Sequence, residues 1–493
     1  MLKQNALIIP SAIRSLVFLS DDKFLISENH RSNPQIQTFY QQVKKALDRE
    51  PEFVPLPVLN QHLESDSEAV NTSENQQKVI ELFRIARDVG ASDIHLEIGY
   101  QGVTQVSMRI HGDLEVIDSL EVQEGKDLAS TIVLSMCDMA EKSFNENRPQ
   151  GGRLASKYLE GLDLFGARYA HTPAVYGLFV VMRIIPDDGD CPPTLDELGF
   201  LPEQQALLGK MLRKPEGIVI LSGPTGSGKS TTLRSFGDQY TALTKGKRRL
   251  LTIEDPPEGK IAGVQIAIVA DRNNPDAVSE AWVGTMTVAL RLDPDGIIVG
   301  EIRCKNSAKT AVNAAMTGHL ILSTLHSNDP FNILERLATL DIEPELIADP
   351  QLMIGLISQR LVQKLCAACC LTFDEVKERL GAEDLALVQR FCDTEKARFH
   401  NPDGCQHCRQ KVRNRYVSQG VKGRTVIAEV VQPDVEMMSL YVKKGRLSAR
   451  KYWRDTLHGI TRNQHLMRLV NQGLVDPLLA HSVSPLDEDE VFL

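Results

Sequence analysis

The chain has 493 residues, of which 42% are hydrophobic and 24% charged, and its formal net charge at pH 7 is −10. A single hydrophobic core rarely serves so long a chain, so we expect about three domains. The acidic balance argues against a protein that mainly coats nucleic acid. No apolar run approaches the ~18 residues that cross a bilayer, and the start has no continuous signal-peptide core, so we expect a cytoplasmic protein.

Residues 1–75 are the least informative part of the sequence. The apolar run Leu16–Leu19 indicates some structure, whereas Ser65–Asn75 has the polar composition of a linker. A terminal segment of this kind is either a small docking element or a leader without fixed structure, and the sequence leaves both open.

Residues 76–188 carry the pattern of an α+β domain. Apolar residues recur at helical spacing from Leu82 to Val89, and a second helical stretch is expected near Asp127–Ser143. Prolines and acids mark residues 189–200 as a linker. Alternating apolar residues predict strands at 91–98, 103–110, 162–170 and 178–185.

Beyond residue 200 the pattern changes to short apolar strands separated by helices. Such strands form a mostly parallel sheet that helices cover on both faces, so residues 201–493 are expected to be an α/β domain. The predicted strands lie at 217–221, 250–254, 296–300 and 320–323, with helices at 275–292 and 305–317.

The first of these strands runs into GPTGSGKSTTL, which has the spacing of a phosphate-binding P-loop. Its glycines let backbone N–H groups point at phosphates, and the following helix adds its N-terminal dipole. Lys229 would bring a positive charge to the β- and γ-phosphates of ATP, and Ser230 would ligate Mg²⁺. The predicted nucleotide-binding residues of the loop are Gly223, Pro224, Thr225, Gly226, Ser227, Gly228, Lys229, Ser230 and Thr231.

Acidic residues follow two further strands. An open parallel sheet binds its ligands at the carboxyl ends of the strands. Glu254, Asp255 and Glu258 are therefore candidates to contact the nucleotide or to orient the attacking water. Glu301 follows the strand after them, at the point where such folds hold an acid against Mg²⁺.

Two histidines stand at the two ends of the strand at 320–323. We expect His319 to bind the nucleotide and His326 to act in catalysis, because a histidine there can contact the γ-phosphate. Arg291, which precedes the strand at 296–300, joins the candidate nucleotide-binding residues.

Four of the nine cysteines form two C-x-x-C pairs that 35 residues separate. In a cytosolic protein such pairs favour a tetrahedral Zn²⁺ site over disulfides, because each pair can hold one metal from a tight turn. The zinc would be structural, in an insert at 366–408 that has little core of its own. The predicted ligands are Cys366, Cys369, Cys405 and Cys408, with Cys370 and His407 as competing ligands.

The motifs GPTGSGKSTTL, TIEDPPE, LDPDGIIVGEIR, TGHLILSTLHSND and SQRLVQKLC, in this order, resemble the Walker A, Asp box, Walker B and His box of the secretion and pilus-assembly ATPases, the GspE/PilB/PilT superfamily. ASDIHLE and RIHGDL resemble the start of that family's second N-terminal domain, and GRTVIAEVV resembles its sequence after the metal-binding insert. The resemblance covers residues 76–431, and a weaker similarity continues to near Pro477.

The resemblance implies a RecA-like P-loop ATPase core after a smaller α+β (PAS-like) domain, assembled as a homo-oligomer, a hexameric ring. It implies that ATP hydrolysis with Mg²⁺ powers assembly of a type IV pilus or a type II secretion pseudopilus. The partner would be a polytopic platform protein of the inner membrane, to which the motor binds peripherally, without direct contact with nucleic acid. The zinc insert is typical of the assembly branch and is absent from retraction motors.

The resemblance also implies roles for single residues. Arg168 and Arg183 match arginines that the family's α+β domain lends to the nucleotide across a subunit boundary, a task that the planar guanidinium suits. Glu258 matches the acid that polarises water, and Glu301 matches the Walker B acid. The predicted catalytic residues are Lys229, Glu258, Glu301, His326, Arg168 and Arg183.

Two departures and two alternative functions stay open. Cys304 replaces the usual aspartate, and Gly296 stands where an aliphatic residue is usual.

The same core could serve a nucleic-acid translocase, using the basic region Lys396–Arg424, or a nucleotide-gated scaffold without turnover. That basic region is either a solvated face or a site for an acidic protein or an anionic lipid surface.

Overall fold

The computed structural model describes residue 13 and residues 16–19, 23–31, 33–47, 49–55, 58–59, 73–138, 143–187, 189, 191–268 and 275–492. The chain divides into two compact units, Met1–Gln77 and Lys78–Leu493. Residues 65–72 of the expected linker Ser65–Asn75 lie outside the described residues.

The first unit has a small core of its own. Strand β1 (Val17–Leu19) pairs antiparallel with β2 (Phe24–Ser27), which pairs parallel with β3 (Glu52–Val54). Helix α1 (Pro34–Leu47) packs Ile36, Phe39 and Val43 against the strands. The apolar run at Leu16–Leu19 therefore contributes to a folded element.

The second unit begins with an antiparallel sheet of strand order β6-β5-β4-β9-β8-β7. Its core joins Phe83 of the first helix to Ile94 and Met182 of the central strands. The helices are α3 (Glu74–Asp88) and α4 (Val122–Thr131), which a π-helical turn (Ile132–Met136) extends. The strands are β4 (Ala91–Ile98), β5 (Thr104–Ile110), β6 (Asp113–Leu120), β7 (Gln150–Arg153), β8 (Leu164–Ala174) and β9 (Gly177–Pro186).

The four expected strands of this domain are β4, β5, β8 and β9, whereas β6 and β7 were not predicted. Both missed strands lie at the sheet edges and bury only one residue each, so they lack a clear apolar alternation. The helix predicted at Asp127–Ser143 starts earlier, at Val122, and its helical turns end at Met136. The sequence did not indicate this earlier start because Gly125 lowers the helical propensity of the first turns. The structure requires glycine there, since an added Cβ would lie 2.2 Å from the Thr104 hydroxyl oxygen.

The remainder of the second unit is built on a seven-stranded sheet of order β12-β11-β13-β14-β10-β15-β20. Every neighbouring pair is parallel except β15 and β20. All six residues of the central strand β10 are buried, as a strand covered on both faces requires. The strands are β10 (Gly217–Ser222), β11 (Leu250–Glu254), β12 (Val264–Ala267), β13 (Gly296–Val299), β14 (Leu320–Leu325), β15 (Met353–Leu365) and β20 (Val421–Val431).

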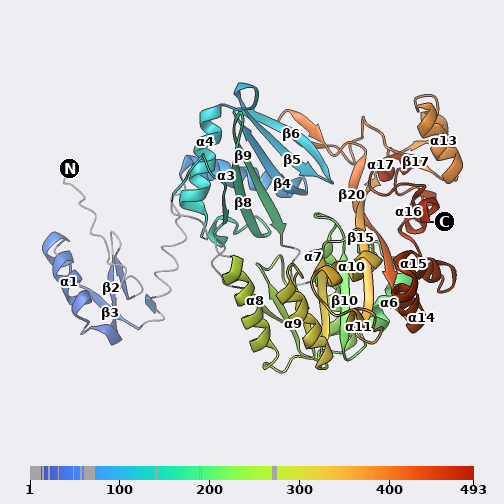
Figure 1. Cartoon of the computed structure of the whole chain (residues 1–493). Helices are drawn as coiled ribbons and strands as arrows, with labels where there is room; N and C mark the ends of the chain where they lie inside the picture. The colour runs from blue at the N-terminus through green and yellow to red at the C-terminus, as the bar shows by residue number, and fades with distance from the viewer. Residues whose placement is uncertain are drawn as a thin grey trace. The chain divides into compact units, whose positions relative to one another are not determined.

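Helices cover both faces of this sheet, and α8 and α9 lie on the side opposite α6 (Figure 1). Ile218 and Ile220 of β10 face α8, α9 and α10, whereas Val219 and Leu221 face α6 and α7. The expected α/β class is therefore confirmed. The helices are α5 (Leu195–Leu198), α6 (Pro202–Met211), α7 (Lys229–Leu243), α8 (Pro275–Ala289), α9 (Lys305–Met316), α10 (Phe331–Thr339) and α11 (Pro344–Ile347).

A cysteine-bearing insert separates the antiparallel strands β15 and β20, and four α-helices and a short 3₁₀ helix (Glu488–Phe492) follow them. Within the insert, β18 and β19 form a hairpin whose Val412 and Val417 are buried in the core of the α+β domain. Arg413, between these strands, also forms an ion pair with Asp118 of β6. The insert contains β16 (Leu371–Thr372), α12 (Phe373–Val376), α13 (Ala382–Phe391), β17 (Arg398–Phe399), β18 (Gln410–Val412) and β19 (Arg415–Val417), and the chain continues with α14 (Val435–Lys444), α15 (Arg446–Asp455), α16 (Arg462–Asn471) and α17 (Pro477–His481).

His465 of α16 joins three segments of the second unit and is fully buried. Its Nδ1 accepts from the backbone N–H of Ala428 at 3.1 Å, so its Nε2 carries the proton and donates to the Gly199 carbonyl at 3.1 Å. Burial lowers the pKa of His465 to about 4. The fold therefore requires the neutral imidazole.

We expect the stability of the second unit to fall in acid through His465. The unfolded chain binds a proton at this histidine below its ordinary pKa of 6.5, whereas the folded chain binds it only below about 4. The contribution is fully present above pH 6.5 and declines by about 3 kcal/mol as the pH falls to 4. As the pH is lowered from 6.5 to 4, the melting temperature of the wild type should fall more steeply than that of His465→Gln. His458→Gln, at an exposed histidine, is the control and should behave as the wild type does. Parallel curves for the wild type and His465→Gln would contradict the assignment.

Candidate functional site

The glycine-rich loop joins β10 to α7 at the carboxyl edge of the parallel sheet. Gly223 has a φ of 153°, and a Cβ there would lie 2.4 Å from the carbonyl oxygen of Gln359 on β15. Gly228 caps α7 with a φ of 82°. Both positions therefore require glycine. Among the other predicted residues, Pro224, Thr225, Gly226 and Ser230 are exposed, Thr231 is half-buried and Ser227 is buried.

Lys229 reaches back across this loop from the first turn of α7. Its Nζ donates to the carbonyl oxygens of Gly223 and Pro224, both at 2.9 Å. Burial lowers the pKa of Lys229, and the carboxylates of Glu301 and Glu258 oppose that shift. Both predicted catalytic acids therefore interact electrostatically with the Lys229 ammonium group.

Glu301 and His326 form a pair beside the loop, each just beyond the end of its strand. The Nε2 of His326 lies 3.1 Å from one carboxylate oxygen of Glu301, and Arg303 donates to the other at 2.8 Å. Burial and the nearby Lys229 ammonium lower the pKa of His326, which Glu301 partly opposes. His326 is therefore neutral at neutral pH, and its ring lies in contact with the carboxylate.

Glu258 is paired with an arginine of the α+β domain of the same chain. The guanidinium of Arg168 on β8 donates to Glu258 Oε1 at 2.8 Å, and each side chain is about one third exposed. Arg183 is the cross-strand neighbour of Arg168, but it binds Asp93 of β4 at 2.9 Å. The structure brings Arg168 to the acid and does not bring Arg183 there.

Glu254 and Asp255 end β11 at the same edge. Glu254 is buried and accepts hydrogen bonds from Thr252 at 2.8 Å and from Gln265 at 3.0 Å. Asp255 is half-buried and precedes a cis peptide bond to Pro256. Gln265 also donates to the carbonyl oxygen of Gly259 at 2.9 Å, so it links Glu254 to the segment that carries Glu258.

The structure does not bring His319 and Arg291 to the loop. His319 precedes β14 at its amino end, where its Nδ1 lies 2.9 Å from the Ala314 carbonyl oxygen. Arg291 is exposed on the connection that leads into β13, also at an amino end. Parallel strands place all amino ends at one edge and all carboxyl ends at the other, so both residues lie across the sheet from Lys229.

The two departures from the family pattern have local explanations. A Cβ at position 296 would lie 3.3 Å from the ring of Tyr240, so this tyrosine occupies the space of the usual aliphatic side chain. Cys304 precedes α9, and its Sγ lies 3.6 Å from the Ser307 hydroxyl, which also accepts from the Cys304 N–H. Neither change removes a predicted catalytic group.

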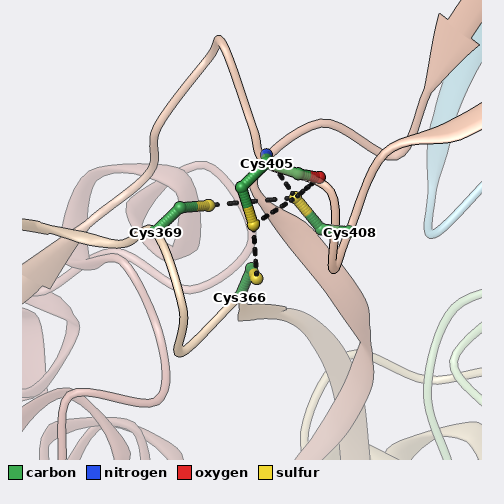
Figure 2. A group of neighbouring side chains, drawn as sticks. All are labelled: Cys366, Cys369, Cys405 and Cys408. Atoms are coloured by element: carbon green, nitrogen blue, oxygen red, sulfur yellow. Dashed lines mark hydrogen bonds between the residues drawn. The ribbon is translucent and has the colours of Figure 1, made fainter.

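The four predicted zinc ligands converge, and Figure 2 shows their sulfur atoms pointing toward one another. The Sγ atoms of Cys366 and Cys405 are 3.8 Å apart, as are those of Cys369 and Cys408. One tetrahedral Zn²⁺ with Zn–S bonds of about 2.3 Å holds sulfurs about 3.8 Å apart, so the residues fit this ion. The competing ligands Cys370 and His407 are not part of the cluster.

Backbone N–H groups favour a thiolate in this cluster. Burial opposes ionisation of Cys408, but the N–H groups of Cys405 and Gly420 donate to its Sγ at 3.1 and 3.2 Å and hold its pKa at about 7. A thiolate is the form that binds metal. The donor set is therefore that of a closed structural zinc site.

Comparison with known proteins identifies the family. A sequence model described as "Type II/IV secretion system protein" matches residues 71–480. The chain belongs to this family. It is 34% identical over 345 residues to the type II secretion system protein E of Pectobacterium carotovorum subsp. carotovorum, a match that covers 69% of the chain and 62% of that protein.

Two further relatives extend the comparison. The type IV pilus assembly ATPase PilB of Thermus thermophilus is 34% identical over 75% of the chain and 38% of its own length. The crystal structure of the pilus retraction motor PilT with bound ADP shares 25% identity and a TM-score of 0.52, over 83% of this chain and 97% of PilT. The chain thus spans less than two thirds of the Pectobacterium and Thermus relatives. Within the described residues, none of the helices combines the length and apolarity that crossing a membrane requires.

Sequence reasoning missed Gln359, which contacts the P-loop from β15. Its Nε2 donates to the Ser227 carbonyl oxygen at 2.6 Å. It belongs to SQRLVQKLC, and the available signal was a pair of polar residues, Ser358 and Gln359, that directly follows the apolar run at the start of the strand.

We expect about one Zn²⁺ per chain and its loss in Cys405→Ser, because three sulfurs leave the tetrahedral site incomplete. Without zinc, amide exchange should rise in the insert and in the hairpin that packs on the α+β domain. The measurements are metal analysis and hydrogen exchange of the intact protein. Cys370→Ser is the matched control, since its thiol is 3.9 Å from the Ala367 carbonyl, outside the cluster. Zinc retained in Cys405→Ser, or lost in Cys370→Ser, would contradict the ligand set.

Proposed function

We propose that the protein is a Mg²⁺-dependent ATPase that powers assembly of a type IV pilus or a type II secretion pseudopilus. The observation that carries this proposal is the glycine-rich loop at the carboxyl edge of the parallel sheet, where Lys229 donates to two loop carbonyls at 2.9 Å and the charges of Glu258 and Glu301 act on it. A positive charge on a phosphate-binding loop beside two acids is what phosphoryl transfer to water needs. A nucleotide-gated scaffold would need the loop but not the acids.

Within this proposal each side chain has a separate task. The loop N–H groups and Lys229 bind the β- and γ-phosphates, and Ser230 and Glu301 hold Mg²⁺, which neutralises phosphate charge when bound. Glu258 orients and deprotonates the attacking water. His326 keeps Glu301 oriented through their contact of 3.1 Å.

The arginine of the α+β domain has two partners in this scheme. Arg168 binds Glu258 in the structure described here. Once the γ-phosphate is bound, its charge competes for the same guanidinium, which would free Glu258 for the water and stabilise the transition state. Arg183 is the neighbouring cation that could add to this effect.

A cavity of about 320 Å³ beside the loop would accept the base and ribose of the nucleotide. Its wall combines loop residues with both domains and with the β15–β20 pair. The lining includes Thr225, Ser227, His111, Asp113, Arg360 and Arg424.

The motor part of the proposal is supported by the names of the relatives, which include a type II secretion protein and a pilus assembly ATPase. We propose a homo-hexamer that works against a polytopic platform protein at the cytoplasmic face of the inner membrane. The four-cysteine insert favours the assembly branch over retraction motors. The direct test is phosphate release by the purified protein with and without the cytoplasmic part of that platform protein.

Replacing the two central residues should separate binding from chemistry. Glu258→Gln should lower kcat about a hundredfold or more while MgATP still binds, because the amide cannot take a proton from water. Lys229→Ala should weaken MgATP binding as well, because it removes a charge from the phosphates. The controls are Glu203→Gln and Lys210→Ala on α6, both at exposed positions. Unchanged turnover in Glu258→Gln would remove this residue from the role of base.

Arg168→Ala should lower kcat about a hundredfold with a smaller change in KM, because an arginine that neutralises the transferring phosphoryl group acts mainly in the transition state. Steady-state kinetics of phosphate release measure both constants. Arg84→Ala on α3 is the control, since this arginine pairs with Glu81 within its own helix. Wild-type turnover in Arg168→Ala would show that its contact with Glu258 is only structural.

A further inference from the structure

Strand β15 forms a wall of the P-loop. At its centre, Gln359 is fully buried and donates from Nε2 to the Ser227 carbonyl oxygen at 2.6 Å. Only the amide NH₂ can face a carbonyl oxygen, so this contact also fixes how the side chain is oriented.

The same strand fits closely against both ends of the loop. At Gly228 an added Cβ would lie 3.3 Å from the Gln359 amide nitrogen, and at Gly223 it would clash with the Gln359 backbone oxygen. Next to these contacts, the Ser222 hydroxyl donates to the Ile357 carbonyl oxygen at 2.9 Å. The conformation of the loop is therefore constrained by its packing against residues 357–359.

The contact with Gln359 sets the direction of one loop N–H group. In a planar trans peptide the C=O of Ser227 and the N–H of Gly228 point in opposite directions. A carbonyl held outward against β15 therefore turns the following N–H inward, toward the side on which a P-loop receives phosphate.

The stability of the fold does not explain why residue 359 is a glutamine. The Oε1 atom of Gln359 is buried and has no hydrogen-bond partner among the described residues. A buried acceptor without a partner costs free energy that an apolar side chain of similar size would avoid.

We propose that Gln359 is a positioning residue that aims the Gly228 N–H at the bound phosphates and so sets the affinity for MgATP. The proposal rests on the nucleotide-binding function proposed above. It assigns Gln359 no contact with the nucleotide and no part in the chemical step.

The test compares MgATP binding by the full-length wild type, Gln359→Met and Gln204→Met, using a fluorescent ATP analogue with Mg²⁺. Gln204 is the matched control, because it is buried and its Nε2 donates to a backbone carbonyl, that of Ala428, at 2.7 Å. Gln359→Met should raise Kd and KM about tenfold, with kcat at saturation nearly unchanged and a melting temperature equal to or above that of the wild type. Gln204→Met should lower the melting temperature and leave Kd unchanged.

Gln359→Glu is the second variant, since it keeps the shape but turns an acceptor toward the Ser227 carbonyl. It should raise Kd more than Gln359→Met does. The proposal is overturned if either folded variant binds MgATP within twofold of the wild type, or if Gln359→Met lowers only the melting temperature. A wild type that binds no MgATP would instead refute the proposed function itself.

Discussion

The shared carboxyl edge of the parallel strands is the constraint on which the site depends. Gly217, Leu320 and Gly296 pair in one row across β10, β14 and β13, so these strands start level and run in the same direction. The segments that follow them carry the loop, His326 and Glu301. Because strand direction decides the edge, residues that lie far apart in the chain meet around Lys229.

Strand β15 connects this edge to the rest of the second unit. Gln359 holds the loop, and four residues later Gln363 donates to the His111 carbonyl at 3.1 Å and to Asp113 at 2.8 Å in the α+β domain. The strand ends directly before Cys366, the first cysteine of the cluster. One continuous strand thus joins the glycine-rich loop, the α+β domain and the cysteine cluster.

Local patterns predicted four of the seven strands of the central sheet, β10, β11, β13 and β14, and the cysteines that converge in the insert. Strand β11 has the predicted bounds, and the four cysteines come together as their spacing indicated. The edge strands β6 and β7 escaped prediction because solvent contact weakens their alternation. His319 and Arg291 were predicted to lie at the loop because they are close to motif residues in the sequence. That closeness does not show that they precede their strands and so lie at the amino edge of the sheet.

The sequence by itself determined the features that depend on neighbouring residues: the glycines that a tight phosphate-binding turn needs, the apolar strands, and the cysteine pairs that suit a metal. Only the tertiary structure decided which distant side chains meet. Arg168 reaches Glu258 across 90 residues, and Gln359 reaches Ser227 across 132. Such pairings depend on strand order and domain packing, and they leave no periodic trace in the chain because they arise only when separate elements pack together.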